Sequence, residues 1–399
     1  MWKELGAIYI VLKIAEVCNL DCPYCYFFYG GDESFQRRPK FISQQTIEGV
    51  GKFVSDGIND CGTNHVLISF HGGEPLMIGK KRFVEMCDTL HRYISPYARL
   101  TLSMQTNGTL IDSEWIDIIS AYEIGIGVSL DGPAHINDRL RVNKDGRGSH
   151  TAVVEGLRHL SDACERGLIR GFAVNCVVTP DSNATDVFHH FVDELGIKDF
   201  DLSPPMMDWS EYDENCVQHV TKFYTELLDL WIKRNDPAIR IGAYSGMLTA
   251  LLTDNGSEAY SRTRSHSMPT FTIRSDGSLC PDDALSPKSE AYRNTGFCVQ
   301  QSSLKEFLRA EFWRDIHVAY VLPAGECESC KWAGLCGGGL AEHRFAPGEG
   351  FSRKSTYCET RTAVCSGLYN YVSSILPSDA VDRRIRASNE CQLSRRTAA

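Results

Sequence analysis

The chain has 399 residues, which exceeds one typical domain and is short for three, so we expect one large domain and a smaller one. With 43% hydrophobic and 23% charged residues, the composition is that of a globular protein and excludes a disordered chain or a fibre. The 41 basic and 51 acidic side chains give a formal net charge of -10, which argues against general electrostatic binding to nucleic acid or to an anionic membrane.

The amino-terminal apolar run and the cysteine content indicate the compartment. Residues 8–12 are apolar, but Lys13 and Glu16 follow closely, so the run is too short and too charged for a signal peptide or a membrane-spanning helix. We therefore expect a cytoplasmic protein with no membrane or nucleic-acid partner. Its 16 cysteines are many for a reducing compartment, which disfavours structural disulfides, so they predict metal or redox chemistry.

Strand-like and helical patterns alternate along the first half of the chain. Short β-branched runs predict strands at residues 8–14, 66–70, 100–104, 125–130, 172–178 and 200–203. Helical periodicity between them predicts helices at residues 43–53, 80–93, 113–121, 150–165 and 185–195. This alternation is typical of repeated βα units, so we expect an α/β fold with a parallel sheet.

Polar clusters directly follow most of the predicted strands. They are Cys18 after the first strand, residues 71–75 after the second, 105–108 after the third, 131–133 after the fourth and 204–205 after the sixth. In parallel βα barrels the carboxyl ends of the strands form the active-site face. We therefore expect these segments to converge on one site.

The chain changes character beyond the predicted strands. Residues 215–255 show helical spacing, and we assign them no chemistry. From Phe271 the sequence predicts a hairpin around Asp276 and Gly277, and a cysteine-rich segment follows that ends near Cys365. We expect this segment to form a second domain and residues 389–399 to form a loose tail.

Cys18, Cys22 and Cys25 form a C-x3-C-x2-C motif in the loop that leaves the first predicted strand. Three thiolates at this spacing can ligate three irons of a four-iron cluster and leave the fourth iron open. An open iron can chelate the amino and carboxylate groups of S-adenosylmethionine (SAM) and pass an electron to its sulfonium bond. A zinc site or buried structural thiols are the alternatives, but zinc usually takes four ligands and no fourth Cys or His lies close in sequence.

The segment CNLDCPYCY at residues 18–26 resembles the signature of the radical SAM superfamily, including the aromatic residue before the third cysteine. The resemblance implies a partial (β/α)6 barrel of the TIM type, in agreement with the six predicted strands. It also implies that Cys18, Cys22 and Cys25 hold a 4Fe–4S cluster that binds SAM and starts radical chemistry.

The same resemblance implies which residues bind SAM. The glycines of the Gly-Gly-Glu-Pro motif let backbone approach the methionyl part of SAM, and Glu74 faces its ammonium group. Arg141 lies in a pattern that looks like the family's His-Asp-x-x-Arg displaced by an insertion, and it faces the SAM carboxylate, with Arg139 as its competitor. The predicted SAM-binding residues are Tyr24, Gly72, Gly73, Glu74, Pro75, Asn107, Ser129, Asp131 and Arg141.

A second cysteine group lies near the carboxyl end. Its members, in the pattern C-x2-C-x5-C followed by a distant fourth thiol, are Cys327, Cys330, Cys336 and Cys358. Four thiolates can ligate one iron–sulfur cluster fully, and they can also bind zinc. Residues 271–366 resemble the SPASM extension of radical SAM peptide maturases, which carries one or two auxiliary four-iron clusters.

A second auxiliary cluster would be incompletely supplied with cysteines. The resemblance places a further cysteine four residues after Cys336, but Leu340 stands there. Cys280 and Cys298 are the remaining candidate metal ligands, and a pair of buried free thiols is the alternative. The candidates to complete that site are Cys365, Asp282, Asp283 or an open iron. We therefore expect one auxiliary cluster or two.

These resemblances predict how the chain is divided. The radical SAM core barrel covers residues 1–230, a helical connection 231–270, the SPASM-like domain 271–370, and a C-terminal helix and tail 371–399.

Residues 336–358 look most like the maturases that cross-link aromatic side chains in ribosomal peptides to form cyclophanes. The anaerobic sulfatase maturases share the architecture, but they place an aspartate base directly after an auxiliary cysteine, where Val299 follows Cys298 here. We therefore expect oxidative joining of an aromatic side chain to a nearby β-carbon of a precursor peptide. Glu342, His343 and Arg344 are candidates for binding the peptide or moving the proton.

Two further functions stay open. One is a peptide oxidase of the anaerobic sulfatase-maturase type or a peptide epimerase, and the other is a non-catalytic iron–sulfur or zinc protein. For an enzyme, the expected partners are the precursor peptide and an electron donor such as flavodoxin or ferredoxin.

Overall fold

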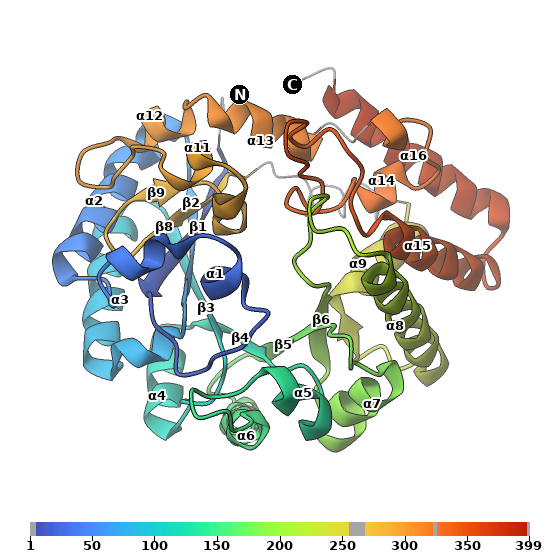
Figure 1. Ribbon diagram of the computed structural model, residues 1–399, viewed down its shortest axis with the longest axis horizontal. Coiled ribbons are helices and arrows are strands. Elements are labelled where there is room, and N and C mark those ends of the chain that lie inside the picture. The colour runs from blue at the N-terminus through green and yellow to red at the C-terminus, as the bar shows by residue number, and fades with distance from the viewer. Residues whose placement is uncertain (1–4, 255–267, 322–324, 397–399) are drawn as a thin grey trace. The chain divides into compact units, whose positions relative to one another are not determined.

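The computed structural model describes residues 5–254, 268–321 and 325–396 (Figure 1). Contacts divide the chain into two compact units. The first contains the described residues within 1–130, 134–174 and 268–313, and the second contains those within 131–133, 175–267 and 314–399.

All six strands predicted from the sequence are present. They are β1 (Ala7–Ala15), β2 (His65–Gly72), β3 (Arg99–Thr106), β4 (Gly125–Ser129), β5 (Phe172–Val177) and β6 (Asp199–Ser203). These strands follow one another through the sheet in chain order, and the pairs β1·β2, β2·β3 and β3·β4 are parallel. The predicted α/β fold with a parallel sheet is confirmed.

The first unit is built from β1 to β4, the start of β5, and a hairpin of β8 (Thr270–Ile273) and β9 (Leu279–Cys280). Ile8, Ile10 and Leu12 of β1 are fully buried, as the apolar pattern of that run predicts. The helices and turns of this unit are α1 (Tyr26–Tyr29), η1 (Glu33–Arg37), α2 (Gln44–Cys61), η2 (Pro75–Ile78), α3 (Lys80–Ile94), α4 (Ser113–Ala121), α5 (Ala134–Leu140), α6 (His150–Glu165), η4 (Asp283–Lys288), α11 (Glu290–Arg293) and α12 (Leu304–Leu308).

Local sequence explains where these helices begin and how they pack. The Ser43 side chain accepts the Thr46 N–H at the start of α2, and Gly62 ends the helix in the left-handed conformation. At Gly57 a Cβ would lie 2.5 Å from the Leu304 side chain, so glycine allows α2 and α12 to pack closely. In Figure 1, α2, α3 and α4 lie along the same side of the strands of this unit.

The second unit contains the end of β5, β6 and β7 (Arg240–Ile241), and it is otherwise mainly helical. Its helices and turns are α7 (Ala184–His189), η3 (His190–Glu194), α8 (Glu214–Arg234), α9 (Gly242–Leu252), most of α13 (Phe312–Val321), η5 (Gly325–Cys327), α14 (Ala333–Cys336), α15 (Cys358–Ser373) and α16 (Ser378–Arg396). At Gly367 of α15 a Cβ would lie 2.8 Å from Leu228 of α8, so these helices are also in close contact.

The structure differs from the sequence-based expectations in three places. The hairpin around Gly277 is present, but β8 pairs in parallel with β1, so this segment belongs to the first unit rather than beginning a separate domain. Residues 389–396 were expected in a loose tail and instead continue α16. The predicted helix at 185–195 is shorter and ends in a π-helical turn, η3.

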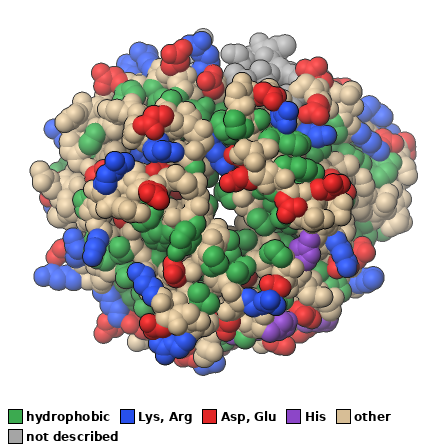
Figure 2. Space-filling view, in the orientation of Figure 1, with side chains coloured by type: hydrophobic (Ala, Val, Ile, Leu, Met, Phe, Trp, Pro, Cys, Tyr) green, Lys and Arg blue, Asp and Glu red, His purple; other side chains and the backbone are tan. Residues whose placement is uncertain are grey.

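Acidic and basic side chains are interspersed among the described residues on the visible face of the molecule (Figure 2). Among the described helices, none combines the length and the apolar content needed to cross a membrane.

Candidate functional site

The cluster loop, residues 18–25, leaves the end of β1 and leads into α1. Within it the Cys25 N–H donates to the Cys22 carbonyl over 3.0 Å, and the Leu20 N–H donates to Cys18 Sγ over 3.3 Å. All three thiols are partly exposed. Three thiols held on a tight turn and open to solvent suit a cluster that must also bind a small molecule.

The surroundings of Cys18 favour its neutral form when no cation is bound. Burial raises the pKa of the Cys18 thiol to about 11, and the negative charges of Glu74 and Cys25 act in the same direction. The Leu20 N–H and the Asn107 amide oppose the shift. A bound iron would supply the positive charge that stabilises the thiolate, so this site fits a cationic group.

The glycine-rich motif packs directly against the start of the cluster loop. The Gly73 N–H donates to the Ala15 carbonyl over 2.8 Å, and the Glu74 N–H donates to the Val17 carbonyl over 2.9 Å. A Cβ at Gly73 would lie 2.3 Å from the Val17 oxygen, and one at Gly72 would lie 2.1 Å from the Ala15 oxygen. These glycines are therefore required by the chain's own backbone, a reason that the sequence alone did not indicate.

Glu74 is fully buried and joins the glycine-rich motif to the end of β3. Its carboxylate accepts the Asn107 N–H and the Thr106 hydroxyl, each over 2.7 Å, and the Leu76 N–H over 3.0 Å. Burial raises the pKa of Glu74, while these hydrogen bonds and the Arg141 guanidinium oppose the shift. The carboxylate is thus an anchor for two loops as well as a candidate partner for an ammonium group.

Asn107 connects the β3 loop to the cluster loop. Its Nδ2 donates to Asn19 Oδ1 over 2.8 Å and lies 3.7 Å from Cys18 Sγ. Asn19 Nδ2 in turn donates to Thr109 Oγ1 over 2.8 Å. Asn19 is thereby held by the side chains of Asn107 and Thr109, which follow β3.

Arg141 also contacts the cluster loop. Its Nη1 donates to Tyr24 Oη over 2.8 Å, and the side chain is buried, whereas Arg139 is exposed. The backbone of the two segments is joined as well, because the Asp21 N–H donates to the Val142 carbonyl over 2.7 Å. Of the two arginines considered from the sequence, the structure places Arg141 at the cluster loop.

Ser129 and Asp131 have partners of their own. Ser129 Oγ accepts Gln105 Nε2 over 2.9 Å at the end of β4. Asp131 belongs to the second unit, where its carboxylate accepts the Val177 N–H over 3.0 Å. Within the first unit the cluster loop therefore gathers Tyr24, the glycine-rich motif, Asn107 and Arg141. The SAM-binding roles of these residues and of Ser129 and Asp131 stay predictions.

The second cysteine group lies within the second unit. Burial raises the pKa of the Cys327 thiol to about 11, and the other three thiols of the group raise it further, so the four sulfurs lie near one another. The Trp332 N–H donates to Cys330 Sγ over 3.4 Å, and Arg361 Nε donates to Cys336 Sγ over 3.1 Å. Gly337, Gly338 and Gly339 all have positive φ and turn the chain away after Cys336.

The spacing of these thiols bears on which metal they suit. A zinc ion with four thiolates at about 2.3 Å draws the sulfurs to within roughly 4 Å of one another. Among the described residues, no three His, Cys, Asp or Glu side chains come together as a single metal ion would require. Four thiolates can also ligate a multi-iron cluster, so the metal that this group holds stays a prediction.

Three residues considered for peptide binding are instead internal to the second unit. Glu342, His343 and Arg344 are each at most 7% exposed. Arg344 donates to the carbonyls of Ala319, Phe351 and Arg353, and the His343 ring packs edge-on against Tyr357. Their contacts stabilise the loops that follow the second cysteine group.

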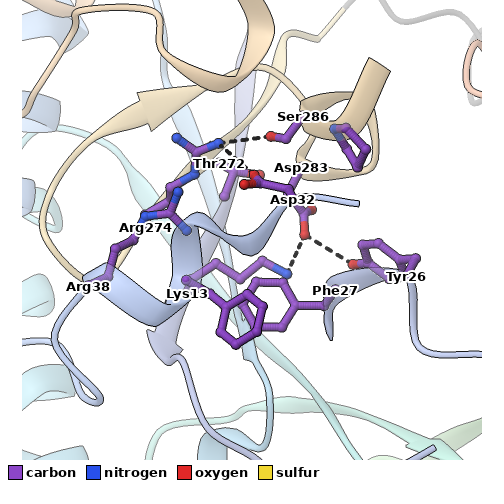
Figure 3. A pocket seen from close by; sticks show the side chains of 11 residues that line it. Lys13, Tyr26, Phe27, Asp32, Arg38, Thr272, Arg274, Asp283 and Ser286 are labelled. Atoms are coloured by element: carbon purple, nitrogen blue, oxygen red, sulfur yellow. Dashed lines mark hydrogen bonds and ion pairs between the residues drawn. The ribbon is translucent and has the colours of Figure 1, made fainter. Parts of the chain in front are cut away.

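The sequence analysis missed the role of Lys13. This lysine of β1 is fully buried and forms an ion pair with Asp283 (Figure 3). Its Nζ lies 3.2 Å from His71 Nδ1. Asp283 also accepts the Tyr26 hydroxyl over 3.2 Å, so β1, the cluster loop and η4 meet at one carboxylate. A single lysine inside an apolar strand run was the signal that could have indicated this network.

Comparison with known proteins agrees with this geometry. Residues 12–191 match the family model described as the Radical SAM superfamily. The chain is 25% identical over 355 residues to the cysteine-type anaerobic sulfatase-maturating enzyme of Clostridium perfringens, a match that covers 86% of this chain and 91% of the relative. It is 33% identical over 155 residues to the serine-type anaerobic sulfatase-maturating enzyme of Bacteroides thetaiotaomicron, covering 38% and 36%.

The fold has a similar solved counterpart. Native anSMEcpe with bound AdoMet and a peptide superposes with a TM-score of 0.75 and 22% identity, covering 93% of this chain and all of that one. Residues 12–191 therefore match the radical SAM superfamily, and the described chain shares the fold of that solved structure.

Proposed function

We propose that this enzyme oxidises a cysteine or serine side chain of a peptide or protein, as a sulfatase-maturase-type peptide oxidase. One observation carries the proposal. The Clostridium perfringens cysteine-type maturating enzyme is matched over 91% of its length, so the similarity continues well beyond residues 12–191.

The cyclophane cross-linking expected from the sequence finds no support in the comparisons. The peptide-oxidase alternative is supported better, and it therefore replaces cross-linking as the main proposal. Val299 after Cys298 is the residue that separates this chain from the sulfatase-maturase pattern, and it makes the reaction product the decisive measurement.

The residues of the cluster loop fit the cofactor. Cys18, Cys22 and Cys25 supply three thiolates, and the Leu20 N–H and Asn107 amide stabilise negative charge on Cys18. When bound there, the cluster and SAM would supply the radical chemistry that begins the proposed oxidation. Glu74 and Arg141 supply an anionic and a cationic group near this loop, as the zwitterionic end of SAM requires.

The second cysteine group is proposed to hold an auxiliary 4Fe–4S cluster on Cys327, Cys330, Cys336 and Cys358. Such a cluster supplies an electron acceptor for the oxidation, and a flavodoxin or ferredoxin is proposed to reduce the enzyme. Arg361 orients Cys336 by donating to both its Sγ and its carbonyl. Arg344 and Lys354 place positive charge near Cys327 and Cys358.

The test compares products from four peptides that are identical except for Cys, Ser, Ala or Tyr at one position. The anaerobically reconstituted full-length enzyme is given SAM and dithionite, 5′-deoxyadenosine is measured by chromatography, and aldehyde is measured by hydrazide labelling and mass spectrometry. We expect an aldehyde from the Cys or Ser peptide, formed with 5′-deoxyadenosine, and none from the Ala peptide.

Other products would contradict this assignment in different ways. Loss of two hydrogens with a new carbon–carbon bond to the Tyr ring would restore cross-linking. An inverted α-carbon that takes up deuterium without a change in covalent composition would indicate an epimerase.

A further inference from the structure

Cys280 and Cys298 are the two thiols that the sequence leaves for a second auxiliary cluster. The structure joins their segments, because the Leu279 N–H donates to the Phe297 carbonyl over 2.9 Å and Ser278 forms an antiparallel bridge with Cys298. Two thiols are too few, since a four-iron cluster takes three or four protein ligands. A cluster here would therefore need at least one further ligand from a nearby side chain.

The space beside the Cys280 sulfur is occupied by protein. Cys280 is fully buried, and the Ser286 hydroxyl donates to its Sγ over 3.7 Å. The same hydroxyl accepts Arg274 Nη2 over 2.8 Å, and Arg274 Nη1 donates to the Arg293 carbonyl over 2.7 Å. Figure 3 shows Arg274 reaching Ser286, so a buried guanidinium is joined to the Cys280 sulfur through a single hydroxyl.

The cations of this region are already compensated by carboxylates. Arg274 pairs with Asp32 at 3.9 Å, Arg38 pairs with Glu16 at 3.6 Å, and Lys13 pairs with Asp283. Buried ions are stable only when they are paired and hydrogen-bonded. These cations are therefore each paired with a carboxylate of the protein, without an anionic cluster.

The acidic candidates for further ligands have other partners. Asp283 is held by Lys13 and by the Tyr26 hydroxyl. Asp282 accepts the Ala284 N–H over 3.1 Å as the N-cap of η4.

Of the remaining candidate positions, Cys365 and Leu340 belong to the second unit. Cys365 is fully buried on α15, with its Sγ 3.7 Å from Met247 Sδ. Leu340 carries no ligand atom and is 44% exposed. The Cys298 thiol donates to Gln300 Oε1.

We infer that the Cys280/Cys298 region holds no iron–sulfur cluster and that a protein-only network of Lys13, Asp283, Arg274 and Ser286 stabilises it instead. The enzyme then has one auxiliary centre, and the electron released by the substrate reaches it without a relay through a second one. This last consequence rests on the proposed function, whereas the absence of a cluster does not.

Iron counting tests the inference independently of the product. Wild-type enzyme, reconstituted anaerobically at full length, should hold about eight irons and eight sulfides rather than about twelve. A variant with Cys280→Ser and Cys298→Ser should keep the same iron content and the same low-temperature EPR spectrum after reduction. A variant with Cys327→Ser and Cys330→Ser is the control and should lose about four irons.

A second measurement addresses the network directly. Arg274→Met should lower the unfolding temperature by about 5 °C or more without loss of iron, whereas Arg309→Met, at an exposed position, should change it little. About twelve irons in the wild type, or loss of iron in the Cys280/Cys298 variant, would overturn the inference. An absent aldehyde product with eight irons would instead count against the proposed function alone.

Discussion

The cluster loop of the first unit and the four-cysteine group of the second unit both hold partly buried thiols, but different charged side chains lie near them. At the cluster loop, burial raises the pKa of Cys18 most, the Leu20 N–H opposes that rise, and the carboxylate of Glu74 adds to it. At the four-cysteine group, Arg344 opposes the rise for Cys327, and Lys354 opposes it for Cys358.

This difference agrees with the two roles that we propose for these sites. Negative charge near a cluster disfavours its reduced state, as a strongly reducing centre requires, whereas positive charge and hydrogen bonds to sulfur favour it, as an electron acceptor requires. Three cysteines at one site and four at the other fit the same division, because only an incomplete ligand set leaves an iron for SAM.

The largest expected effect follows from removing the thiols of the cluster loop. With Cys18, Cys22 and Cys25 all changed to Ala, 5′-deoxyadenosine formation should fall by at least about 100-fold and iron by about four atoms, because those thiolates are the proposed ligands. Chromatography and iron analysis measure both. SAM cleavage that persists in this variant would remove the basis for assigning the cluster to this loop.

Removing the four-cysteine group should reduce formation of the peptide product more than it reduces SAM cleavage. Ala at Cys327, Cys330, Cys336 and Cys358 should reduce peptide product by more than about tenfold, while SAM cleavage stays within about a factor of ten of wild type. Circular dichroism must first show that the variant is folded. Equal loss of SAM cleavage and of product would contradict the assignment of SAM cleavage to the cluster loop and of later electron transfer to the four-cysteine group.

A single methyl group should disturb the cluster loop. Gly73→Ala brings a Cβ to 2.3 Å from the Val17 oxygen, so it should destabilise the fold by about 1–3 kcal/mol and lower the iron content. Gly6→Ala is the matched control, since a Cβ there meets no atom within 4 Å. Denaturant unfolding and iron analysis of both variants give the answer, and identical behaviour would show that the loop adjusts without cost.

The smallest expected effect is electronic. Arg361→Met removes the hydrogen bond to Cys336 Sγ and should make the auxiliary cluster harder to reduce, shifting its potential negative by on the order of tens of millivolts. Arg383→Met, which changes an exposed arginine paired with Asp379, should leave the potential unchanged. Spectroscopic redox titration measures the shift, and a positive shift would contradict the assigned role of Arg361.

Patterns along the chain predicted the strands well because alternation and burial are local properties. The β-branched runs at 8–14 and 66–70 became β1 and β2 with small changes at their ends. The position of β8 could not be found in this way, since a parallel partner may be any strand, and its pairing with β1 depends on the path of the whole chain. The same holds for Arg361, whose sequence neighbours do not indicate a contact with Cys336.

The sequence by itself indicated the resemblance to radical SAM enzymes, the six strands and the C-x3-C-x2-C and C-x2-C-x5-C motifs, because each strand or motif is carried by residues close together in the chain. Tertiary structure decided between Arg141 and Arg139, buried Glu342, His343 and Arg344, and assigned Gly72 and Gly73 to contacts with the cluster loop. It also filled the surroundings of Cys280 with Arg274 and Ser286. The side chains that surround a given residue come from segments up to hundreds of positions apart in the sequence, and only folding brings these segments into contact.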